Sequence, residues 1–241
     1  MSAPLHVGAR EITFSGQSAS GRSLYPTAQG LTWHYATRAI RDGIPGNETP
    51  MEMAVLSVAE TKGLREAVLR RRYRDLQLPE TRVQTTPREI SLSRLADPPP
   101  PGGPFLKILK FPIKADQSWA GRQLPLGNSE TVSIVGWESI RVPAGSFSAL
   151  HVRHTLQYAN GGNDSLDYWY TEGLGCAKMV ETITILIGGL PKKLVAEGLL
   201  RRMEKGGPVV TADKRPPGTP RFGGTLNWLP LEAFNAEGQS R

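Results

Sequence analysis

The chain has 241 residues, of which 39% are hydrophobic, and it contains 26 glycines and 20 prolines, a composition that argues against a helical bundle and favours a turn-rich β protein. Its length allows one large β domain with a sizeable core. The 29 basic residues exceed the 22 acidic ones for a formal charge of +7, and the single cysteine, Cys176, excludes an internal disulfide and is expected to be a small core residue.

Residues 1–23 are rich in Ser, Gly and Ala and show little periodicity, which predicts an extended N-terminal arm. The first residues lack the charged and apolar regions of a signal peptide. No run approaches the ~18 consecutive apolar residues that a spanning helix needs, so the sequence predicts no transmembrane segment.

Strand-like alternation begins near Thr32, and residues 51–60 supply the next predicted strand. Residues 64–76 can be interpreted in two ways. Leu64, Val68 and Leu69 have helical spacing among good helix formers, whereas Lys62 and Gly63 form a plausible tight turn that leads into a strand. We predict a strand for residues 64–76 and keep a helix as the alternative.

Two further short strands are predicted at residues 80–86 and 89–95, followed by a proline-rich connection at residues 98–104. The clearest pattern comes next, where alternating residues on both sides of a turn at residues 143–146 predict a long antiparallel hairpin. An aromatic strand at residues 168–170 and a final strand at residues 194–203 complete the sheet.

The sequence therefore predicts an all-β protein, with an antiparallel curved sheet or open half-barrel and extended N- and C-terminal tails. We divide it into an N-terminal arm (1–23), an antiparallel β domain (24–204) and a Pro/Gly-rich linker with a C-terminal docking tail (205–241).

Four short motifs resemble a family of bacterial envelope proteins and lipoproteins, most of them uncharacterised. The family patterns are Pro-x-x-Gly-x-x-Trp, Val-Pro-Ala-Gly-Thr-Phe and Trp-Tyr-Ala-x-Gly-Val-Gly, and the match spans residues 24–203. The resemblance implies the β fold, a strand at residues 64–76 and an envelope location, and it brings no catalytic residue. This chain departs from the family at Asp116, Cys176 and Ala177. The matching segments are Leu24-Tyr25-Pro26 with Gly30 and Trp33-His34-Tyr35, Lys110-Phe111-Pro112-Ile113 with Ser118-Trp119, residues 142–147, and residues 168–175.

Common catalytic signatures are absent from the sequence, including a phosphate-binding loop, Gly-x-Ser-x-Gly, paired cysteines and His-Glu-x-x-His. His151 and His154, three residues apart on a strand, point to opposite faces, and we expect His154 to be a structural histidine. Asp164, Asp167 and Glu172 lie beside a turn and are interpreted as turn residues. We therefore expect no enzyme activity, no cofactor and no metal site.

Four tryptophans, at positions 33, 119, 137 and 169, could line a pocket for an apolar ligand or stack on sugars. We favour core packing as their main role.

Two segments are candidate partner-binding sites. The first is the basic strip at residues 62–74, where Arg70, Arg71, Arg72 and Arg74 could bind an acidic or membrane-proximal surface. Tyr73 is its only aromatic residue, so we do not expect nucleic acid as a partner. The second is the C-terminal tail, whose apolar residues need a cover. These tail residues are Leu226, Trp228, Leu229, Leu231 and Phe234.

The function predicted from the sequence is that of a non-enzymatic accessory or assembly subunit of a bacterial envelope or membrane-associated complex, which binds a protein partner through its tails and basic strip. The alternative is a carrier or binding module for an apolar ligand or lipid in a half-barrel cavity. The expected location is periplasmic or envelope, with a leader removed before Met1, and a cytoplasmic location is the alternative.

Overall fold

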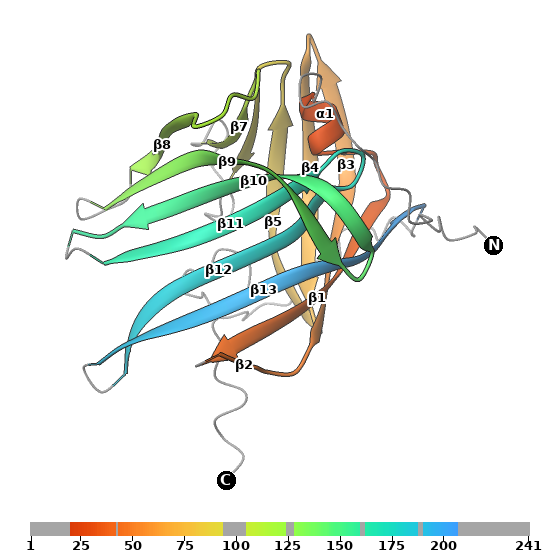
Figure 1. Ribbon diagram of the computed structural model, residues 1–241. Coiled ribbons are helices and arrows are strands. Elements are labelled where there is room, and N and C mark those ends of the chain that lie inside the picture. The colour runs from red at the N-terminus through yellow and green to blue at the C-terminus, as the bar shows by residue number, and fades with distance from the viewer. Residues whose placement is uncertain are drawn as a thin grey trace, which may run out of the picture.

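The computed structural model describes residues 20–41, 43–93, 105–123, 128–159, 162–187 and 190–206. Almost all of these residues lie in antiparallel strands, beside one helix of four residues (Figure 1). The predicted all-β antiparallel fold is confirmed. The elements in chain order are α1 (Gly21–Leu24), β1 (Leu31–Arg41), β2 (Ile44–Pro45), β3 (Thr49–Thr61), β4 (Leu64–Tyr73), β5 (Leu76–Thr85), β6 (Glu89–Ser93), β7 (Phe105–Lys110), β8 (Ser118–Gln123), β9 (Ser129–Val142), β10 (Gly145–Gln157), β11 (Asn163–Thr171), β12 (Gly175–Ile187) and β13 (Leu190–Lys205).

The strands form one 13-stranded sheet in the order β7-β6-β5-β4-β3-β1-β13-β12-β11-β10-β9-β8, with the short β2 paired to β1. Two meanders, β3 to β7 and β8 to β13, are joined because β1 pairs with both β3 and β13. The sheet curls so that β9 to β13 cross in front of β3 to β5 (Figure 1). Its edge strands β7 and β8 contact each other, so the curled sheet is a nearly closed barrel with one seam.

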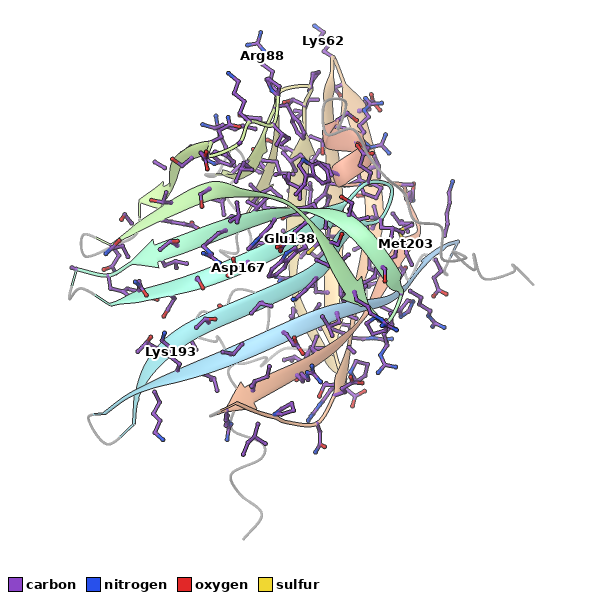
Figure 2. The ribbon with its side chains drawn as sticks, in the orientation of Figure 1. Lys62, Arg88, Glu138, Asp167, Lys193 and Met203 are labelled. Carbon is purple, nitrogen blue, oxygen red and sulfur yellow. The ribbon has the colours of Figure 1, made fainter. Side chains whose placement is uncertain are left out.

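Within the ambiguous residues 64–76, the predicted strand is confirmed for Leu64–Tyr73, which form β4 and pair with both β3 and β5. Arg74 and Asp75 form the following turn, and Leu76 begins β5. Ala67 and Leu69 are buried on alternate positions, which a helix could not achieve with the same residues. The turn before β4 has positive φ at Lys62 (45°) and Gly63 (82°), as a two-residue hairpin turn requires. Lys62 marks the tip of this hairpin at one end of the barrel (Figure 2).

The predicted hairpin around residues 143–146 is also confirmed. β9 ends at Val142 and β10 begins at Gly145, and these two residues pair across the turn. Gly145 has φ of 142°, a conformation that favours glycine. The hairpin continues to Ser129 and Gln157, with a register shift where Gly136 faces His151 and Ile134 faces Val152.

The short helix α1 closes one end of the barrel. Ser20 caps it by accepting a hydrogen bond from the backbone N–H of Ser23, and Leu24 and Tyr25 are buried in the core. The carbonyl oxygen of Ser23 accepts a hydrogen bond from Gly173 N in the β11–β12 turn. Residues 20–23 were expected in the extended arm, but they begin the segment that closes this end of the barrel. Residues 1–19 lie outside the described residues.

Side chains fill the space between the two halves of the sheet (Figure 2), where one hydrophobic core follows the period-two alternation. Met51, Met53 and Val55 face it from β3, and Leu150 and Val152 face it from β10. Cys176 is buried in this core, as expected. In the described parts of the chain, no helix is long and apolar enough to cross a membrane.

Candidate functional site

A half-enclosed cavity of about 70 Å³ lies inside the barrel, between β3 to β6 on one side and β11 and β12 on the other. Its wall is mostly apolar and aromatic, which is the usual composition of a small-molecule site. Three methionines, three tyrosines and one arginine are among its residues. The lining residues are Tyr25, Met51, Met53, Leu69, Arg71, Thr81, Leu92, Tyr168, Tyr170, Cys176 and Met179.

Tyr25 covers the end of the cavity that is closed by α1. Its ring lies 6.1 Å from that of Tyr170, so these two lining tyrosines form an aromatic floor. The ring of Trp33, which is not part of the lining, lies 6.4 Å from Tyr25. The segment after α1 is fixed to β4 because Arg65 donates hydrogen bonds to the side-chain and backbone oxygens of Thr27, at 2.9 and 2.6 Å. The cavity is therefore closed at this end by packed side chains.

The hydroxyl groups of Tyr25 and Tyr170 and the thiol of Cys176 stay neutral at physiological pH. Burial raises the pKa of Tyr25 and Tyr170 well above the ordinary value for tyrosine. Burial also raises the pKa of the Cys176 thiol to about 12, and this thiol donates a hydrogen bond to the Lys178 carbonyl oxygen at 3.2 Å. Cys176 is thus a wall residue and not a reactive thiolate.

Arg71 is the only charged residue among the described residues that line the cavity. It faces inward because it follows Ala67 and Leu69 at the period of two, and its Nη2 lies 3.5 Å from the Thr81 Oγ1 acceptor on β5. Its charge lowers the pKa of Tyr25, which remains raised because burial and Cys176 outweigh this effect. The field of the guanidinium therefore reaches the aromatic floor.

A second interior polar group lies further along β9 to β12. Nδ1 of His154 and Oε1 of Glu130 are 3.0 Å apart, both side chains are fully buried, and Glu181 is buried nearby on the same interior face. Tyr168 links this group to the cavity, because its ring meets the His154 ring edge-on at 5.3 Å. The prediction of a hydrogen-bonded structural His154 agrees with this geometry.

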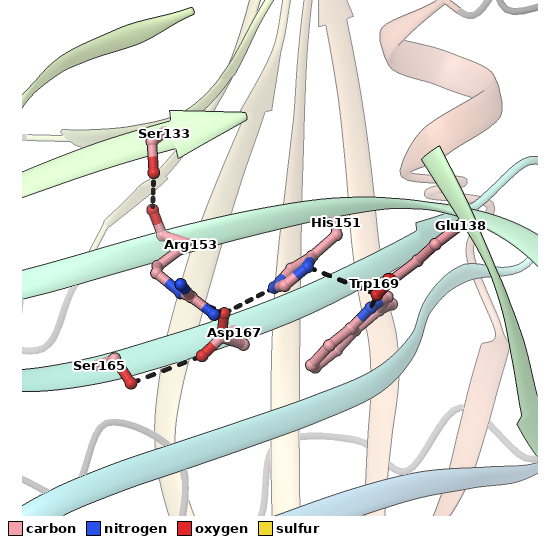
Figure 3. Close-up of polar contacts among 7 residues, drawn as sticks. All are labelled: Ser133, Glu138, His151, Arg153, Ser165, Asp167 and Trp169. Atoms are coloured by element: carbon pink, nitrogen blue, oxygen red, sulfur yellow. Dashed lines mark hydrogen bonds and ion pairs between the residues drawn. The ribbon is translucent and has the colours of Figure 1, made fainter. Parts of the chain in front are cut away.

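The outer face of β10 and β11 carries a different network, shown in Figure 3. Asp167 Oδ1 lies 2.6 Å from His151 Nε2 and accepts a hydrogen bond from Arg153 Nε at 2.7 Å. His151 stacks on Trp169 at 4.3 Å, and the Trp169 indole donates to Glu138. His151 and His154 thus face opposite sides of the sheet, as the sequence predicted.

The basic strip does not form one surface. Alternation turns Arg71 into the cavity, whereas Arg72 faces outward and pairs with Glu52 at 2.7 Å. Arg70 also lies on the outer face, opposite Ala54 of β3. Arg74 sits in the following turn and donates a hydrogen bond to Thr49 Oγ1 at 3.1 Å.

The other sequence candidates are spread over the molecule. Asp164 accepts hydrogen bonds from Tyr158 and Thr184, Asp167 belongs to the outer network, and Glu172 accepts from Ser23. Across the described segments, no group of three or more His, Cys, Asp or Glu side chains could hold a metal ion. The proline-rich connection and the tail residues Leu226, Trp228, Leu229, Leu231 and Phe234 lie outside the described residues.

Tyrosines and methionines line the cavity, whereas the sequence had suggested tryptophans as possible lining residues. Trp33, Trp119 and Trp169 are buried elsewhere, and Trp137 packs against the core. A usable signal was present in Tyr168-Trp169-Tyr170, because alternation places both tyrosines on the face opposite Trp169. The methionines carried no such signal, because apolar residues on an inner face predict packing as readily as a cavity.

Neither a known family model nor a curated protein matches this sequence. The fold is similar to that of a protein from Bacteroides fragilis NCTC 9343 described as exported and as having a YmcC-like fold, with a TM-score of 0.50, 14% identity, and coverage of 76% of this chain and 99% of that chain. A protein from Parabacteroides distasonis ATCC 8503 described as a lipoprotein has a TM-score of 0.48, 14% identity, and coverage of 78% and 100%. At this identity the first likeness shows the fold alone.

Proposed function

We propose that this protein is a non-catalytic binding module that holds an apolar chain inside its barrel, in the bacterial cell envelope. The observation that carries the proposal is the half-enclosed cavity between the two halves of the sheet, whose wall is mostly apolar. Burying an apolar chain there removes hydrocarbon from water and contributes about 0.8 kcal/mol for each methylene group.

The size of the cavity favours one chain over a bulky ligand. Its volume of about 70 Å³ is about half that of an engineered apolar cavity of ~150 Å³ that binds benzene, so the wall must adapt as the chain enters. Met51, Met53 and Met179 supply this freedom, because methionine has three rotatable bonds and fills irregular space at little cost.

The envelope location rests on the fold likeness to a protein described as exported and on the resemblance of the sequence motifs to envelope proteins. The accessory-subunit role, with a protein partner bound through the tails and the basic strip, stays a prediction. No contact in the described residues favours it over the cavity, because the strip is divided between faces.

Binding can be measured with the full chain and the neutral fluorescent probe 1-N-phenylnaphthylamine, displaced by alkan-1-ols from hexanol to tetradecanol. We expect affinity to rise about fourfold with each added methylene and to stop rising once the cavity is full. Leu92→Phe narrows the cavity and should shorten the chain at which this plateau occurs. Val135→Phe, on the exposed outer face, is the matched control. Equal plateaus in both variants, or no displacement at all, would contradict the proposal.

A further inference from the structure

Arg71 is placed at the end of the cavity away from α1. Along β4, the inward side chains run from Arg65, which binds Thr27 beside α1, through Ala67 and Leu69 to Arg71. The next inward residue, Tyr73, pairs with Met51 at the far end of the strand. A chain that lies in the cavity with one end near Tyr25 therefore has its other end near Arg71.

The chemistry of this end differs from that of the rest of the wall. A guanidinium presents several N–H donors in a planar fork that fits a carboxylate or a phosphate with two parallel hydrogen bonds. The contact between Nη2 and Thr81 Oγ1, at 3.5 Å, orients the side chain from β5, and Thr81 is itself buried. A cation among apolar walls interacts more strongly with an anion than it would in water.

The remaining wall adds no competing charge. Tyr25, Tyr170 and Cys176 contribute neutral groups to the lining, because burial raises the pKa of each of them far above neutrality. The buried carboxyl groups of Glu130 and Glu181 lie on the interior face beyond Tyr168 and are not part of the lining. An anionic group in the cavity would thus face one positive charge among lining residues that otherwise carry no formal charge.

We propose that the ligand is a single-chain amphiphile with an acidic head group, whose head binds Arg71 while its chain extends toward Tyr25. This inference rests on the proposed function and adds the class of ligand to it. Arg71 then selects the ligand by its charge, and the methionine and tyrosine wall selects it by the width of one chain. Carboxylate and phosphate monoester head groups share the chemistry that Arg71 recognises.

The test compares three compounds with the same chain, dodecanoate, dodecyl phosphate and dodecan-1-ol, by displacement of the neutral probe from the full chain at about pH 8, where both acids are ionised. We expect at least one acid to bind about tenfold or more tightly than the alcohol. In Arg71→Gln this preference should disappear while dodecan-1-ol still binds. Arg71→Lys should restore part of it, because it keeps the charge without the fork.

Arg72→Gln is the matched control, because the neighbouring arginine faces outward and should leave the preference unchanged. Binding of the acids and of dodecan-1-ol to the unmodified protein can be compared without any variant. This comparison therefore tests the inference even if Arg71→Gln does not fold. Equal binding of all three compounds would overturn this inference and leave the proposed function intact. Failure of all three to displace the probe would remove the proposed function, and this inference with it.

Discussion

The indole N–H of Trp119 on β8 donates a hydrogen bond of 2.8 Å to the carbonyl oxygen of Lys107 on β7. These two strands are the edges of the sheet, so the bond joins the barrel at the place where backbone pairing ends. The ammonium group of Lys110 lies 5.3 Å from the center of the Trp119 ring and covers it. One side chain thus connects the two edges that the strand order leaves open.

Trp119→Phe should loosen this seam. The substitution keeps an aromatic ring in the interior but leaves the Lys107 carbonyl oxygen without its donor, which costs about 1 kcal/mol of unfolding free energy. Urea denaturation measures the loss, and amide hydrogen exchange should accelerate in β7 and β8 more than in β1 and β13. Uniform acceleration across the sheet would show that Trp119 stabilises the core in general and not the seam.

Lys62→Asn should stabilise the protein. Lys62 has φ of 45° at the first position of the β3–β4 turn, a conformation that asparagine tolerates better than lysine. The expected gain is about 0.5 to 1 kcal/mol in unfolding free energy. Gly63→Ala should lower the unfolding free energy, because Gly63 has φ of 82°, which alanine adopts poorly. Equal unfolding free energies for the two variants would show that the turn does not have this backbone conformation.

Local signals were sufficient for much of the fold. The turn at Pro143 and Ala144 and the turn at Lys62 and Gly63 each depend on residues that are adjacent in the chain, so both could be predicted. The helical spacing of apolar residues suggested a helix as the alternative for residues 64–76. That alternative was wrong because the intrinsic helix propensity of these residues is a weaker effect than the burial they gain by pairing with β3 and β5.

The cavity could not be predicted from local sequence signals. Arg71 is in phase with Ala67 and Leu69, yet within a run of arginines it was interpreted as part of a charged surface. Its neighbours across the cavity, Tyr168 and Met179, are about a hundred residues away in the chain and are brought opposite β4 only when the sheet curls. The pairing of His151 with Asp167 likewise depends on the register between β10 and β11.

Asp167→Asn should remove part of the stability of the protein above pH ~4. Burial raises the pKa of this carboxyl group, but hydrogen bonds from His151 and Arg153 together with their charges outweigh burial and hold the pKa below its ordinary value. A lowered pKa in the folded state stabilises the protein above the unfolded pKa, and this contribution is lost as the pH falls through the folded pKa.

The melting temperature of the wild type should therefore fall more steeply at acid pH than that of Asp167→Asn, and the two should converge at the lowest pH. The exposed Glu80→Gln is the control and should follow the wild-type curve. Parallel curves for Asp167→Asn and wild type would show that the outer network contributes no acid-dependent stability.

The buried pair of Glu130 and His154 should show strong coupling in a double-mutant cycle. Both side chains are fully buried and 3.0 Å apart, so removing either one leaves a polar partner in the core and costs about 3 to 5 kcal/mol. In Glu130→Leu with His154→Leu, both polar groups are replaced by apolar ones, and the loss should be smaller than the sum of the two single losses. The cycle is measured by urea denaturation, with Leu156→Ala as an apolar reference on the same face of β10. Additive losses would mean that each side chain is stabilised by other groups and that the 3.0 Å contact between them contributes little.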